Sequence, residues 1–136
     1  MTRVPLHRNT AVTVIEGQVP YTFTSDKNQK ENFTSVDGEA VLGKIGGLNL
    51  TSWNYIGHDP QQFRHYGPVA QEFFAAFGND AVGTVGTPTT INSGDVEGIL
   101  MIAVQALEKR TAENAALKAR IEAVEAAVEA LQAERR

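Results

Sequence analysis

Ser25 and Lys30 are the residues whose types and spacing best fit a covalent reaction in this chain. A serine hydroxyl is a poor nucleophile at neutral pH and needs a base beside it. A lysine amine can be that base when desolvation favours its neutral form. The two residues lie five positions apart in a polar segment, and a turn between them would bring their side chains together. Judged by these residues alone, an ordinary polar turn after a strand explains the segment better.

A second motif is the run from Gly38 to Lys44, whose seven residues fit the first seven positions of a phosphate-binding P-loop. The eighth position is Ile45, which has no hydroxyl to bind magnesium. The apolar residues of this segment also recur at helical spacing, where a P-loop requires an irregular loop. The segment therefore predicts an amphipathic core helix rather than a nucleotide site.

The remaining polar motifs favour structural roles. His7, His58 and His65 do not have the spacing of a metal site, so we expect no metal and no other cofactor. The sequences that begin at Asn32 and Asn49 match glycosylation acceptors, but without a secretion signal they are attributed to chance. Several aromatic side chains are expected to pack in the core rather than to form a ligand-stacking surface: Trp53, Tyr55, Phe73, Phe74 and Phe77.

Composition limits the classes of partner. The chain has 136 residues, 42% of them apolar, which is enough for one domain with a core. The 12 basic and 16 acidic residues give a net charge of -4 without a basic block, so no nucleic-acid partner is expected. Cysteine is absent, which excludes disulfides. No signal peptide and no membrane-spanning segment are recognised, so no membrane partner is expected.

Three regions are predicted to position these residues. Residues 1–24 are rich in β-branched side chains and predict short strands joined by a turn. Residues 25–94 predict a small mixed α/β unit, with a helix carrying Val41 to Leu48, a strand over residues 48–55 and a helix from Pro68 to Gly78. Thr34 and Asp37 resemble a capping box before the first helix, which Gly46 and Gly47 can end. Residues 79–94 predict a loop with at most one strand, near residues 89–91.

Residues 95–136 predict one long helix, capped by Ser93 or Asp95. Its apolar residues alternate by four and three, as in the a and d positions of a coiled coil. Opposite charges fall at the g and e positions, in the pairs Glu113 with Lys118 and Arg120 with Glu125. The alternative is a helix packed on its own domain, and the seam alone does not choose between two strands and three. The predicted seam consists of Leu107, Asn114, Leu117, Ile121, Val124, Val128 and Leu131.

Four separated blocks resemble one known family. They are Ser25-Asp26 with Lys30-Glu31-Asn32, then Trp53-Asn54-Tyr55, then the run from Arg64 to Phe73, and last the entry into the C-terminal coil. Residues 25–110 are similar to the C-terminal intramolecular chaperone of phage endosialidases, tail spikes and tail fibres, a self-cleaving serine peptidase family. The resemblance implies an α+β fold whose long helix forms a homotrimeric coiled coil.

The resemblance also implies roles for individual residues. Ser25 would attack the carbonyl group of Thr24, so the scissile bond would be Thr24–Ser25, and Lys30 would be the base. Asp26 and Asn32 would orient the turn or stabilise the oxyanion. His65 would support the site, although a purely structural histidine is an equal alternative.

The function expected from this resemblance is a chaperone that holds three chains in register, with the upstream fibre segment of the same chain as its client, and then cuts itself free. It would act in the cytoplasm of the host bacterium during assembly, and the fibre would end in a virion or a phage-tail-like particle. Family members follow long fibre or enzyme regions, whereas 24 residues precede Ser25 here, so the chain is expected to be a part or a remnant of a longer protein. The alternatives are a structural trimerisation module that does not cleave and, ranked lower, a processing domain of a transcription factor.

Overall fold

The computed structural model describes residues 12–13 and 22–136, with side chains from residue 24 onward. The chain divides into two compact units, Met1–Ser35 and Val36–Arg136, and each is described by itself. The fold class is α+β, as predicted.

The first unit contains a short antiparallel pair. Strands β1 (Val12–Thr13) and β2 (Thr22–Phe23) face each other with Val12 opposite Phe23. The predicted strands agree with the structure at these positions, while the predicted turn between them and His7 lie outside the described residues. The chain then enters a single 3-10 turn, η1 (Lys27–Gln29).

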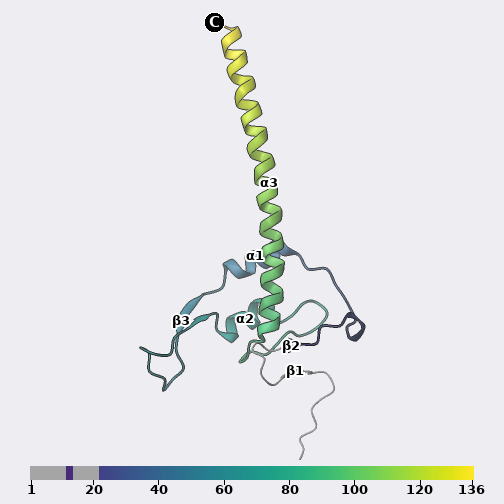
Figure 1. The fold of residues 1–136 in the computed structure, drawn as a ribbon, viewed down its shortest axis with the longest axis vertical. Helices are drawn as coiled ribbons and strands as arrows, with labels where there is room; N and C mark the ends of the chain where they lie inside the picture. Colours follow the sequence, from purple (N-terminus) through teal and green to yellow (C-terminus); the bar gives the residue numbers. More distant parts are fainter. Residues whose placement is uncertain (1–11, 14–21) are drawn as a thin grey trace, which may run out of the picture. The chain divides into compact units, whose positions relative to one another are not determined.

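The second unit is built around three helices: α1 (Gly38–Gly46), α2 (Ala70–Phe77) and α3 (Ser93–Glu134). Its core joins Val41 of α1, Phe73 and Phe77 of α2, and Ala103 of α3, all of them buried. The predicted stripe on α1 is confirmed, because Leu42, Ile45 and Leu48 pack against this cluster. In Figure 1, α1 lies across the N-terminal half of α3, and the C-terminal half of α3 extends beyond both shorter helices.

The contact between α1 and α3 is close because its residues are small. Gly38 lies so near Ala106 that a β-carbon on Gly38 would be 2.9 Å from the β-carbon of Ala106. One turn further along α3, Arg110 forms a two-pronged ion pair with Glu39 of α1. The beginning of α1 is therefore fixed to α3 by van der Waals contact and by charge.

The helix ends correct several predictions. Asp37 by itself caps α1, accepting from the backbone N–H groups of Glu39 and Ala40 at 2.9 and 3.3 Å. The prediction that Gly46 and Gly47 end this helix is confirmed, since Gly47 is its C-cap. Helix α2 begins at Ala70, later than the predicted Pro68.

The cap of α3 and the strands also differ from the predictions. Asn92 caps α3 in place of Ser93 or Asp95, because its side chain accepts from the N–H of Gly94 at 2.9 Å. Strand β3 (Thr51–Trp53) is shorter than predicted and pairs with β4 (His65–Gly67), which was not predicted. Between residues 79 and 90, isolated bridges join Asn79 to Thr84 and Thr87 to Thr90 in what is otherwise a loop.

Candidate functional site

The segment that follows β2 makes a tight turn, which Asp26 begins. An Asp26 carboxylate oxygen accepts from the backbone N–H of Asn28 at 3.0 Å, so this side chain caps η1. The backbone N–H groups of Gln29 and Lys30 then donate to the carbonyls of Asp26 and Lys27 at 3.1 and 3.2 Å. Aspartate and asparagine commonly stabilise such turns by bonding to the backbone two residues away. The turn reverses the chain between positions 25 and 30.

As a result of this turn, Lys30 reaches Ser25. The Lys30 Nζ donates a hydrogen bond to the Ser25 Oγ, and the two atoms are 2.5 Å apart. A serine that is activated by a neighbouring base must lie within hydrogen-bonding distance of that base, and this pair does.

Solvent reaches the whole of this segment, because every residue from 24 to 37 is exposed in the single chain. The ion pairs among the described residues join Lys109 to Glu113, Arg110 to Glu39 and Lys118 to Glu122. Within that described part of the chain, the amine of Lys30 therefore contacts a hydroxyl and not a carboxylate.

Two further residues of the segment have distinct positions. Asn32 has a φ of 54°, in the left-handed region that asparagine tolerates better than most residues. It thus turns the chain just after Lys30. Asn28, which the sequence reasoning did not single out, donates its side-chain amide to Asp26 at 3.0 Å. The signal that could have found it is the spacing of an aspartate and an asparagine two residues apart, which is typical of such turns.

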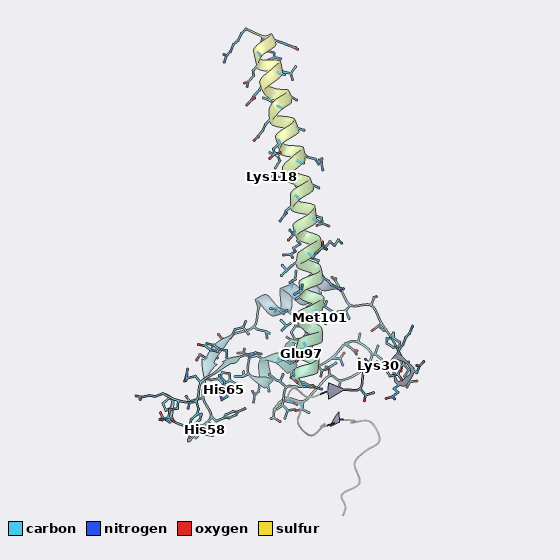
Figure 2. All side chains as sticks on the ribbon, viewed as in Figure 1. Lys30, His58, His65, Glu97, Met101 and Lys118 are labelled. Carbon is cyan, nitrogen blue, oxygen red and sulfur yellow. The ribbon has the colours of Figure 1, made fainter. Side chains whose placement is uncertain are left out.

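His65 belongs to the second unit, on β4, and lies in a cluster of rings. Its imidazole is stacked on Trp53 with centroids 4.8 Å apart, and Tyr55 meets it edge-on at 5.4 Å. The cluster continues through His58 to Phe63, with centroids 5.6 Å apart. Strands β3 and β4 and the residues between them, 51–67, form a hairpin arm, and Figure 2 shows His58 and His65 on it.

This cluster corrects the prediction that all five aromatic residues lie in the core. Phe73 and Phe77 are buried and Phe74 is half-buried, but Tyr55 is 57% exposed. Trp53 is also outside the core cluster. A two-stranded hairpin offers no second layer to bury them, so the rings pack on one another. At the base of the arm, Arg64 donates to Asn54 and Ser52 at 2.9 and 2.8 Å.

The predicted seam lies on the free part of α3. Ala103 and Ala106 are the buried residues of this helix, and every residue from 107 to 136 is exposed. An open groove in this part of the helix is lined by Leu117, Ile121 and Val124 together with Arg120 and Glu125. The apolar stripe has no covering in the single chain over these residues. Figure 2 shows the side chains of this part of α3, including Lys118, projecting from a single helix.

The other predicted motifs are accounted for as follows. The P-loop-like segment forms α1, a helix, as the amphipathic pattern predicted. Among residues 12–13 and 22–136, no group of three histidine or acidic side chains is placed to hold a metal ion. In the same described ranges, no helix has both the length and the apolarity needed to cross a membrane.

Comparison with known families finds a match that begins at Ser25 and ends at residue 82, the family described as chaperone of endosialidase. Residues 25–82 are therefore similar to the chaperone of endosialidase family. The family is also one of serine peptidases. The match covers less than half of the chain and contains Ser25, Lys30, both strands of the hairpin and the helices α1 and α2. No curated protein matches the chain.

The matched segment ends before α3 begins, so the long helix lies outside it. The two are nevertheless joined physically, because α1 from the matched segment shares its core and the Glu39–Arg110 ion pair with α3. Residues 36–82 of the matched segment and the start of the long helix thus belong to one packed unit.

Proposed function

We propose that this chaperone assembles three copies of its chain through α3 and then cuts itself away from the preceding segment at the Thr24–Ser25 bond. The observation that carries the proposal is the 2.5 Å contact between Lys30 Nζ and Ser25 Oγ at the first residues of the family match. Ser25 is the nucleophile and Lys30 is the base. Asp26 and Asn32 shape the turn, and His65 supports the assembled domain through the hairpin arm.

The reaction balances with these two side chains and one water molecule. The Ser25 hydroxyl gives its proton to a neutral Lys30 amine while its oxygen bonds to the Thr24 carbonyl carbon. When the carbon–nitrogen bond breaks, the ammonium returns that proton to the Ser25 nitrogen, which leaves an ester between Thr24 and the Ser25 oxygen. Water then gives a proton to Lys30 and bonds to the Thr24 carbonyl carbon. The bond from that carbon to the Ser25 oxygen breaks, and the Lys30 ammonium returns the proton to this oxygen. The products are a Thr24 carboxylate and a chain that begins with the free amine of Ser25.

Assembly would supply the burial of the Lys30 amine, which the single chain does not provide. A lysine works as a base in its neutral form, and burial favours that form. Because residues 24–37 are all exposed in the single chain, the covering surface must come from elsewhere. We propose that neighbouring copies provide it, so that cleavage follows correct assembly.

The long helix is the part proposed to hold the copies together. In a parallel arrangement, Glu113 of one copy would face Lys118 of the next, and Arg120 would face Glu125. Asn114 would fix the register, since a buried amide is best satisfied by its own symmetry mates. Joining the chain ends raises the effective concentration of the upstream segments, which reduces the entropic cost of aligning them.

The proposed client is an upstream fibre or spike segment of the same chain, and assembly in a host bacterial cytoplasm is the proposed setting. Residues 1–24 would be the end of that client, residues 25–94 the chaperone and residues 95–136 the coil. Cleavage would make assembly irreversible, because the released fibre no longer carries its assembly device.

The test is the intact mass of the purified chain under denaturing conditions. The wild type is expected to yield a species that begins at Ser25, whereas Ser25→Ala and Lys30→Ala are expected to remain whole. Ser35→Ala and Lys27→Ala are the matched controls, since both residues are exposed in the same segment. Both controls should cleave as the wild type does. Light scattering of each sample is expected to give the mass of three copies.

A non-cleaving trimerisation module is the second candidate, and the exposure of the Ser25–Lys30 segment favours it. Under that function the wild type remains one unbroken polypeptide while light scattering still gives three copies. An unbroken chain that is also a single subunit would contradict both candidates.

A further inference from the structure

Asn28 holds the carboxylate of Asp26 through two hydrogen bonds. Its backbone N–H and its side-chain amide both donate to the same Asp26 oxygen, each at 3.0 Å. The backbone bond is sufficient to cap the turn, as in many aspartate-initiated turns. The side-chain bond is additional, and it fixes the direction in which the carboxylate points.

That direction matters because charged residues flank Lys30 in the sequence of this turn. Asp26 and Glu31 are the acidic residues of the segment, and Lys27 is the other basic residue. A carboxylate that paired with Lys30 would favour the charged amine, and a charged amine cannot accept the Ser25 proton. The ion pairs of the described part of the chain include neither Asp26 nor Glu31, and the Lys30 amine donates to Ser25 instead.

We infer that Asn28 is a positioning residue, which keeps the Asp26 carboxylate on η1 and leaves the amine of Lys30 to Ser25. This inference rests on the proposed self-cleavage. No hydrogen bond joins Asn28 to Ser25 or to Lys30 in the described part of the chain, so its effect on them would pass through Asp26. Its amide is a neutral donor, so it satisfies the carboxylate without adding a charge beside Lys30.

The test is the pH dependence of cleavage in Asn28→Ala. Full-length chain is made by cell-free translation, kept in urea and then diluted into buffers from about pH 6 to about pH 10. This range runs from below neutral pH to near the ordinary pKa of lysine side chains. The appearance of the chain that begins at Ser25 is followed by mass spectrometry. Loss of the amide frees Asp26 to approach Lys30, so the half-maximal pH is expected to rise by up to about one unit. The rate near neutral pH then falls by up to about tenfold and recovers in alkaline buffer.

Rescue separates this role from simple stabilisation of the turn. In the double variant Asp26→Asn with Asn28→Ala, no carboxylate is left to pair with Lys30, so the half-maximal pH is expected to return towards that of the wild type. Gln29→Ala is the matched control, because it removes the neighbouring exposed amide of the same turn, and its profile should not move.

Each outcome has a distinct meaning. If Asn28→Ala keeps the wild-type profile, or slows cleavage equally at every pH without rescue by Asp26→Asn, the inference is wrong while self-cleavage stands. If the wild type never cleaves at any pH, the proposed function fails and the inference fails with it.

Discussion

The contact between α1 and α3 predicts that two glycines of one helix respond in opposite ways to the same substitution. In Gly38→Ala, the new β-carbon would lie 2.9 Å from that of Ala106. Carbon atoms prefer about 3.5–4.0 Å, so the helices must separate by roughly 1 Å. Ala106 is buried and its methyl group has no rotamer by which to move aside. Overpacking of this kind costs about 1–3 kcal/mol.

Gly43→Ala is the matched control on the same helix. A β-carbon on Gly43 would have no neighbour within 4 Å, and Gly43 is an interior position of α1. Alanine in a helix interior is more stable than glycine by about 0.5–1 kcal/mol. The free energies of unfolding of the two variants are therefore expected to differ by about 1.5–4 kcal/mol, with the wild type between them.

The assay is urea unfolding followed by circular dichroism, with all variants at one protein concentration because self-association shifts apparent stability. Ala106→Gly removes the facing methyl group and should relieve the strain of Gly38→Ala. The double-mutant cycle is then expected to show a favourable coupling of about 1 kcal/mol or more. The reasoning is refuted if Gly38→Ala is as stable as Gly43→Ala, or if the cycle shows no coupling.

Two further predictions concern the charge pair and the seam. The hydrogen bonds from Arg110 hold the pKa of Glu39 below its ordinary value. A carboxyl group with a lowered pKa stabilises the fold at pH values above its ordinary pKa, and this stabilisation is lost as the pH falls. Wild type and Glu39→Gln should therefore differ in their urea midpoints at neutral pH and converge below about pH 4. The difference in urea midpoint should be small, because both partners of the ion pair are half-exposed. A difference that stays constant into acidic buffer would contradict a role of the ion pair. On the coil, Ile121→Lys should weaken association at least about tenfold by light scattering and reduce cleavage with it. Ala119→Lys, on the outer face of the same turn, should leave both unchanged, and equal effects of the two lysines would argue against the seam.

Several features of the site were within reach of the sequence because they depend on residues near one another in the chain. The reach of Lys30 to Ser25 needs only a turn of a few residues, and the local polar sequence supplies one. Asn28 was missed although it obeys the same local rule, since an Asp-x-Asn spacing is common and does not by itself indicate a role. Whether Ser25 and Lys30 perform chemistry depends on what covers them, which no short segment encodes.

Three features could be predicted from the amino-acid order alone: the apolar stripe of α1, its end at Gly46 and Gly47, and the unbroken length of α3. These follow from periodicity and backbone preference, which act within a few residues. Two features became known only from the folded chain. They are the pairing of β3 with β4, and the burial in the core of Phe73 and Phe77 rather than Trp53 and Tyr55. Strand pairing and burial depend on contacts between segments that are distant in sequence. A strand of three residues such as β4 forms because β3 supplies its hydrogen-bonding partner.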